Sequence, residues 1–197
     1  MKRRFQRKLG ERRYKKLFVI STEGAKTEPE YFKLLQHENV VLKVLSSKGG
    51  LHNSPLHVLK RMEQYLQKNP LRKTDEAWIV IDKDQWSDEQ IMELHRWAKK
   101  SPNRGLAVST PKFELLLLKH YEHGFGTMSS HECTARLKQY FPTYDKGIPA
   151  GKFSLVEIQQ AIHRAKQRDN PPCKEWPRAT GTTVYRLLEK ILLAHGS

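Results

Sequence analysis

The feature that most constrains the fold is a regular alternation of short apolar runs with segments that begin like helices. The apolar runs are continuous rather than alternating, which predicts buried strands, and they lie at residues 17–21, 40–45, 77–81 and 106–109. Each is followed by a capping side chain with a proline or a Glu or Gln close behind it, which predicts helices at residues 27–36, 54–69, 87–100 and 112–121. Four strand–helix units predict an α/β fold with right-handed crossovers and a mainly parallel, four-stranded sheet flanked by helices on both faces.

The pattern changes after Tyr121, where Gly124 and Gly126 mark a flexible connection. The rest of the chain predicts helices near residues 131–141, 154–168 and 182–194. We therefore expect a basic tail at residues 1–16, an α/β domain at 17–125 and a helical extension at 126–197 that packs on it.

Charge is the first indication of a partner. The chain has 36 basic and 21 acidic residues, a net charge of +15, and the first sixteen residues hold nine of the basic ones against a single acid. Polyanions are the natural partners of such a chain, because each phosphate that is neutralised releases a counterion. We expect Arg3, Arg4 and Arg7 in the tail to contact nucleic acid; the alternative is a disordered, solubilising end.

Other features bear on where the protein works. No apolar run approaches the roughly 20 residues that a membrane span needs, and the first residues lack the apolar stretch of a signal peptide. The two cysteines, Cys133 and Cys173, form no CxxC pair. These features predict a cytoplasmic protein with no membrane partner and imply no disulfide framework.

Acidic residues follow the predicted strands at the ends where ligands bind in parallel α/β sheets. Glu23 follows the first strand, Asp82 and Asp84 follow the third, and Glu114 lies in the first turn of the helix after the fourth. We expect all of them at one edge of the sheet.

Asp82 and Asp84 are two residues apart on a segment that we expect to be extended, so their side chains should point the same way. Carboxylates held together repel unless a cation lies between them, and oxygen-rich sites suit Mg²⁺ or Mn²⁺. Glu23 would be a third ligand or a general base, and Glu114 would assist. The alternative is that the Asp-Lys-Asp segment is an ordinary turn.

Four segments, taken together and in this order, resemble the RloB-like family. They are Ser-Thr-Glu-Gly-x-x-Thr-Glu (21–28), Val-Ile-Asp-Lys-Asp (80–84), Ser-x-Pro-x-Phe-Glu-Leu-x-Leu-Leu-x-His (109–120) and Gly-Thr-Thr-Val-Tyr-x-Leu (181–187). The resemblance implies a Toprim-like fold, the metal-binding α/β module of topoisomerases, primases and overcoming-lysogenization-defect-type nucleases. Toprim domains have a glutamate after the first strand and an Asp-x-Asp after a later one, and Glu23, Asp82 and Asp84 match those positions.

The resemblance also implies a role in bacterial or archaeal antiviral defence, as the toxic nuclease of an abortive-infection pair encoded beside an ABC-type ATPase. Together with the charge and the strand-end acids, it favours a metal-dependent nuclease acting on RNA or DNA. Two other hypotheses stay open: a non-catalytic nucleic-acid-binding module, and a toxin or sensor subunit regulated by a partner ATPase. The sequence leaves the oligomeric state open.

Further candidates surround the same edge. Lys26, Lys83, Lys112 and His120 are expected to contact the nucleic-acid backbone, although the lysines would equally well neutralise the acids. Ser109-Thr110-Pro111 would open a helix whose free N–H groups hold a phosphate, or would simply be a cap. Trp86 would stack on a base.

A zinc site is disfavoured by the sequence. The only group of residues with a zinc-like composition matches no standard zinc-finger spacing, and it consists of His120, His123, His131 and Cys133. We interpret it as a surface histidine cluster.

Overall fold

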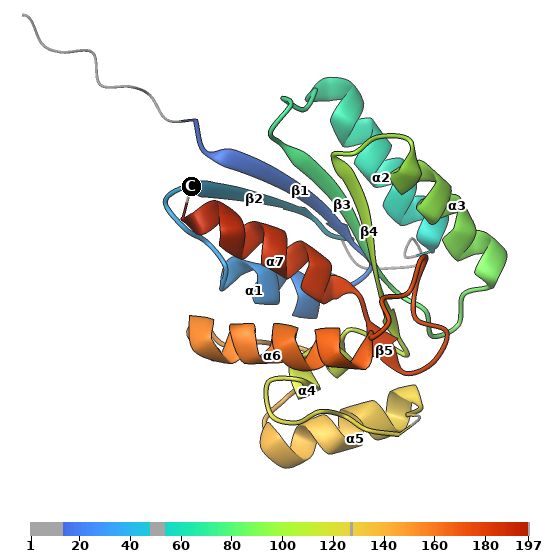
Figure 1. The fold of residues 1–197 in the computed structure, drawn as a ribbon, viewed down its shortest axis with the longest axis vertical. Helices are drawn as coiled ribbons and strands as arrows, with labels where there is room; N and C mark the ends of the chain where they lie inside the picture. Colours follow the sequence, from blue (N-terminus) through green and yellow to red (C-terminus); the bar gives the residue numbers. More distant parts are fainter. Residues whose placement is uncertain (1–13, 48–53, 127, 197) are drawn as a thin grey trace, which may run out of the picture.

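The computed structural model describes residues 14–47, 54–126 and 128–196, and its centre is a five-stranded sheet in the order β2-β1-β3-β4-β5 (Figure 1). Its strands are β1 (Lys16–Thr22), β2 (Val40–Leu45), β3 (Glu76–Asp82), β4 (Arg104–Thr110) and β5 (Gly181–Thr182). The first four are parallel, as the sequence predicted, but β5 pairs antiparallel with β4. The expected four-stranded sheet is therefore wrong in one respect: the sheet is mixed and has a fifth, edge strand.

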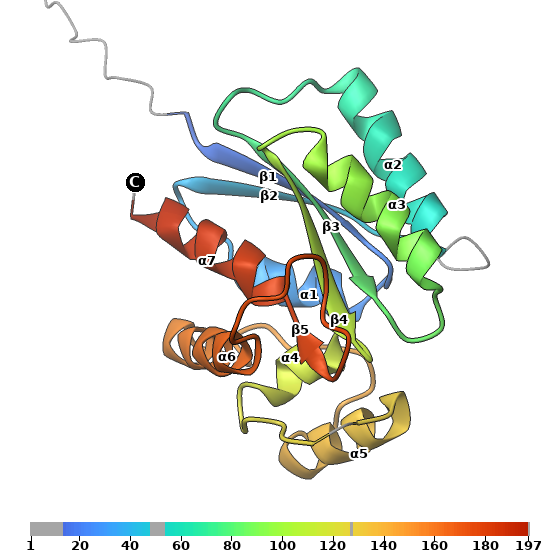
Figure 2. The ribbon, with the colours of Figure 1, turned by 45° about the vertical axis from the view of Figure 1, so that its right-hand side comes forward.

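Helices cover both faces of the sheet. They are α1 (Thr27–Lys33), α2 (Pro55–Lys68), α3 (Asp88–Lys99), α4 (Glu114–Leu118), α5 (Ser130–Tyr140), α6 (Leu155–Arg168) and α7 (Val184–His195). Helices α2 and α3 lie together on one face, whereas α1 and α7 lie on the other (Figure 2).

Alternate residues of the central strands supply the two layers of core. Phe18 and Ile20 pack with α1 and α7, and Val19 and Ile79 pack with α2 and α3. Because both faces are buried, these strands are apolar at successive positions. The two-sided burial expected from the continuous apolar runs is confirmed.

Two of the predicted helix starts are confirmed as capping boxes. Ser87 with Gln90 begins α3, and Ser154 with Glu157 begins α6. The predicted cap at Thr27 is wrong, because its hydroxyl donates to the Lys146 carbonyl oxygen at 2.9 Å instead of capping α1. A tertiary contact has replaced the local one.

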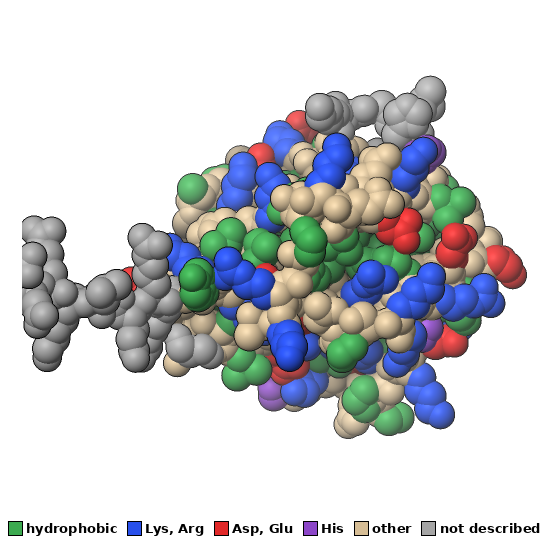
Figure 3. Space-filling view, turned by 90° about the horizontal axis from the view of Figure 1, so that it is seen from above, with side chains coloured by type: hydrophobic (Ala, Val, Ile, Leu, Met, Phe, Trp, Pro, Cys, Tyr) green, Lys and Arg blue, Asp and Glu red, His purple; other side chains and the backbone are tan. Residues whose placement is uncertain are grey.

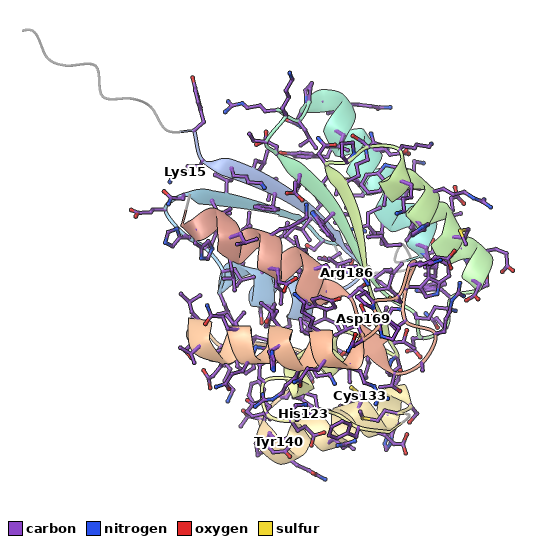
Figure 4. All side chains as sticks on the ribbon, in the orientation of Figure 1. Lys15, His123, Cys133, Tyr140, Asp169 and Arg186 are labelled. Carbon is purple, nitrogen blue, oxygen red and sulfur yellow. The ribbon has the colours of Figure 1, made fainter. Side chains whose placement is uncertain are left out.

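The chain after residue 126 is not purely helical, because it supplies β5 as well as α5, α6 and α7. The expected helix from Thr182 begins at Val184, since Gly181 and Thr182 pair with β4. The Asp169 carboxylate forms a 2.7 Å ion pair with Arg186 and accepts a hydrogen bond from the Tyr185 hydroxyl (Figure 4). These contacts attach the loop before β5 to α7. Residues 17–125 and this later region share one hydrophobic core.

No helix in the described parts of the chain has the length and apolar character needed to span a bilayer.

Candidate active site at the carboxyl edge of the sheet

Glu23 and Asp82 come together because β1 and β3 are neighbours. The register pairs Thr22 with Val80, and the Glu23 N–H continues that ladder to the Val80 carbonyl oxygen at 3.2 Å. The Glu23 carboxylate then accepts the Asp82 N–H at 3.2 Å. Residues that end adjacent parallel strands thus meet at one edge, as the sequence predicted.

Glu114 reaches the same edge from α4. Its side chain is buried, and Oε1 accepts the Tyr144 hydroxyl at 3.0 Å. The Asp82 carboxylate accepts the Phe113 N–H at 2.9 Å, which fixes the start of α4 beside the end of β3. Tyr144 comes from the loop after α5, so the region beyond residue 126 also contributes to the site.

Glu28, in the first turn of α1, is a member of the site that strand-end reasoning did not single out. It is buried, and its Oε1 accepts the Gly24 N–H at 2.9 Å. A Cβ atom on Gly24 would lie 2.1 Å from Glu28 Oε2, so only glycine allows this close approach. The signal in the sequence is the glycine after Glu23 with a glutamate four residues further on. We call Glu23, Glu28, Asp82 and Glu114 the acidic cluster.

The electrostatics of the acidic cluster show that its members crowd one another. Burial raises the pKa of Asp82 well above its ordinary value, and Glu28, Glu23 and Glu114 raise it further. Burial also raises the pKa of Glu23 to about 7. Hydrogen bonds from Asp82 and Trp86 oppose this rise, and repulsion from Glu28 and Asp84 adds to it. The pKa of Glu28 is raised by burial and by Glu114. A cation placed among these groups would relieve both effects.

Asp84 lies differently from the prediction. The strand ends at Asp82, and a turn closed by the Trp86 N–H and the Lys83 carbonyl oxygen at 3.0 Å follows. Asp84 is in that turn and is exposed, whereas the Asp82 carboxylate is held against Phe113. The two side chains therefore do not share an extended segment, and Asp84 flanks the acidic cluster from the solvent side.

The donor chemistry of the acidic cluster suits a hard divalent cation, because all four side chains are carboxylates and the pKa values of three of them are raised. Their present arrangement is set by protein donors. Within residues 14–47, 54–126 and 128–196, no three His, Cys, Asp or Glu side chains are positioned to hold a metal ion. That statement includes His120, His123, His131 and Cys133.

The lysines expected to contact nucleic acid are partly engaged. Lys83 forms a 3.1 Å ion pair with Asp88 and donates to the Trp86 carbonyl oxygen, and Lys26 is exposed and donates weakly to the Asp145 carbonyl oxygen at 3.4 Å. Lys112 is half-buried beside the site. Arg3, Arg4 and Arg7 lie outside the described residues.

His120 does not contact solvent, which corrects the expectation that it binds phosphate and that it belongs to a surface histidine cluster. It is buried, its Nε2 lies 3.2 Å from the Tyr31 hydroxyl, and its ring stacks on Phe153 at 3.8 Å between centroids. Burial lowers its pKa to about 4, so the ring is neutral at physiological pH.

Two further expectations change at this edge. Thr110 does not cap a helix, because its hydroxyl donates to the Pro177 carbonyl oxygen and α4 begins only at Glu114. The Phe113 N–H that a phosphate would need is already donated to Asp82. The Trp86 indole N–H donates to Glu23 Oε1 at 3.1 Å, which assigns this side chain to positioning Glu23.

These features define an α/β protein with a buried acidic cluster at the carboxyl edge of a mainly parallel sheet. A family model described as RloB-like protein matches residues 18–191. The chain therefore belongs to the RloB-like family, as its motifs indicated. No curated protein and no solved structure matches it.

Proposed function

We propose that the protein is a metal-dependent nuclease of the Toprim type that hydrolyses phosphodiester bonds. The observation that carries the proposal is the acidic cluster: carboxylates from β1, α1, β3 and α4 converge where parallel α/β sheets bind ligands. Such a concentration of buried negative charge weakens the metal-free fold, and a structural role alone gives no reason for it.

Asp82, Asp84 and Glu23 would hold Mg²⁺ or Mn²⁺, with Glu28 and Glu114 beside them. A bound cation would orient a water and stabilise charge on the scissile phosphate. Of the carboxylates, Glu23 is the candidate general base, since its pKa of about 7 lies where a base works best. Trp86 orients Glu23, and Tyr144 orients Glu114 through its hydroxyl.

The proposed substrate is RNA or DNA, supported by the net charge of +15. The family membership supports a cytoplasmic role in antiviral abortive infection, with an ABC-type ATPase as the regulating partner. Lys26, Lys83 and Lys112 would contact the backbone near the scissile bond.

One observation favours a second candidate, a nucleic-acid-binding subunit without catalysis. Every member of the acidic cluster already accepts a hydrogen bond from a protein donor, and the described residues hold no preformed metal site. Under that hypothesis, the carboxylates only organise the edge of the sheet.

The test replaces Asp82 by asparagine, which keeps the acceptor for the Phe113 N–H but removes the charge. We expect cleavage of labelled RNA or DNA with Mg²⁺ or Mn²⁺ to fall by more than about 100-fold, beyond the effect of losing an outer-shell partner of a metal. Glu63→Gln, an exposed glutamate on α2, is the matched control and should cleave normally. Cation binding measured by calorimetry should be weakened in parallel. Full cleavage by Asp82→Asn would exclude the proposed site, and wild-type protein that neither cleaves nor binds a cation would favour the second candidate.

A further inference from the structure

The opposite edge of the sheet, where the parallel strands begin, holds a groove of about 830 Å³. It lies between the starts of β1 and β3, the turn before β4, the loop before β2 and the end of α7. Its lining includes Tyr14, Lys15, Lys16, Lys73, Glu76 and Asn103. The central strands have seven residues each, so this groove is on the order of 20 Å from the acidic cluster.

Basic residues precede each of the three central parallel strands. They are Lys15 just before β1 and Lys16 at its first position, Arg72 and Lys73 before β3, and Lys99 and Lys100 at the end of α3, before β4. Of these residues, Lys15, Lys16 and Lys73 line the groove. Figure 3, which looks onto this end of the molecule, shows Lys and Arg side chains spread over most of the face, with a group of acidic side chains at its right-hand side. Figure 4 shows Lys15 beside the start of β1.

Two acids, Glu38 and Glu76, line the groove beside Lys15, Lys16 and Lys73, so the lining itself keeps a positive excess of one charge. Glu76 is already paired with Lys16 at 2.8 Å and with Lys190 at 2.9 Å. Burial alone would raise the pKa of Glu76, but these two lysines outweigh it and the pKa is lowered. Asp75 is buried and accepts the Leu17 N–H and the Arg72 N–H. By contrast, Lys15, Lys73, Lys99 and Lys100 are exposed and form no ion pair with any described residue.

An aromatic side chain stands at the mouth of the groove. Tyr14 is 75% exposed, and the Arg72 guanidinium lies 4.5 Å from its ring centroid. Cationic side chains along a groove, together with an exposed ring, are the combination that binds single strands, because bases stack on the ring while phosphates meet the cations. In the sequence, the thirteen residues before Tyr14 include seven Lys and Arg.

We propose that this groove is a second nucleic-acid site that holds single-stranded RNA or DNA through its phosphates, with Tyr14 stacking on a base. The groove would anchor substrate or product at a distance from the acidic cluster. This proposal rests on the proposed function only in taking nucleic acid as the class of ligand. It is tested by binding in EDTA, so it can fail or hold independently of cleavage.

The test is the salt dependence of single-stranded oligonucleotide binding, measured by fluorescence anisotropy. Lys15→Ala/Lys73→Ala/Lys100→Ala removes two lysines that line the groove and Lys100, which lies two residues before the lining residue Pro102. Each phosphate contact on a single strand contributes about 0.7 to the slope of log K against log salt. The slope should therefore fall by about 2, and affinity at 0.15 M salt should fall by about 50-fold. Tyr14→Ala should weaken binding without changing the slope, whereas Tyr14→Phe should bind normally.

The control removes three lysines that are exposed elsewhere, with Lys43→Ala/Lys60→Ala/Lys138→Ala on β2, α2 and α5. It should lose much less affinity than the groove variant. An unchanged slope in the groove variant, or equal losses in both triple variants, would overturn the proposal. Tighter binding of a mononucleotide than of the oligonucleotide would overturn the choice of a strand as the ligand.

Discussion

Glu23 provides the sharpest test of the electrostatics at the carboxyl edge. Burial raises its pKa from the ordinary 4.5 to about 7, a difference worth about 3 kcal/mol. Because the folded protein binds this proton more tightly than the unfolded chain, the associated stability is complete below pH 4.5. It is lost as the pH rises to about 7.

Replacing Glu23 by glutamine removes that charge but also one acceptor. The glutamate accepts both the Asp82 N–H and the Trp86 indole N–H, whereas glutamine offers one oxygen. The unpaired donor should cost about 1–3 kcal/mol. We therefore expect Glu23→Gln to be less stable than wild type at pH 4.5. At pH 8 it should be equal to wild type or more stable, because removing the buried charge then regains about 3 kcal/mol and offsets the lost hydrogen bond.

The assay is urea unfolding in EDTA at pH values from 4.5 to 8. The quantity to follow is the difference in unfolding free energy between Glu23→Gln and wild type, since titrating groups away from Glu23 cancel in it. Asp82, whose pKa Glu23 raises, adds to the difference in the same direction. The exposed Glu63→Gln should give a difference that is flat with pH. A difference for Glu23→Gln that does not move by more than about 1 kcal/mol across this range would refute a strongly raised pKa.

Three further predictions concern other buried groups. Burial depresses the pKa of His120, so wild type should lose about 3 kcal/mol of stability as the pH falls from 6.5 to about 4, and His120→Phe should abolish that loss. Urea unfolding checks this, with His163→Gln at an exposed histidine as a control that leaves the loss intact. Asp169→Asn should destabilise the fold by about 1–3 kcal/mol, because it removes the charge that pairs with Arg186 while the Cys173 carbonyl oxygen still accepts from that guanidinium, and thermal unfolding would detect it. Cys133 should resist thiol reagents in the native state, since it is buried with its pKa raised to about 12; rapid labelling without unfolding would contradict its position.

The sequence predicted the parallel strands and the meeting of Glu23 with Asp82, because both follow from apolar periodicity and from the rule that parallel strands end at one edge. It missed β5, since Gly181–Thr182 is two residues long and becomes a strand only by pairing with β4. It also misplaced His120, because a histidine near a strand edge carries no local sign of whether its ring faces solvent or core.

The cap prediction at Thr27 failed for a related reason. Thr27 and Glu30 have the spacing of a capping box, but the Glu30 carboxylate accepts the Ile148 N–H and the Thr27 hydroxyl holds the Lys146 carbonyl oxygen. Both side chains thus bind a loop more than a hundred positions away in sequence. Local propensity was overridden by a long-range contact that also brings Tyr144 to Glu114.

The two edges of the sheet carry charge of opposite sign, and their separation matters for the proposed chemistry. If the lysines that precede the strands lay beside the acidic cluster, they would pair with Glu23 or Asp82 and lower the pKa values that are now raised. A distance of about 20 Å is far beyond the roughly 4–6 Å at which an opposite charge lowers a carboxyl pKa, so those lysines neither pair with the carboxylates nor compete with a divalent cation for them. A strand held by its phosphates at the basic edge would still be free to extend toward the acidic one. The fold can therefore retain a strongly basic surface for a polyanion while it keeps a group of under-compensated carboxylates available for a cation.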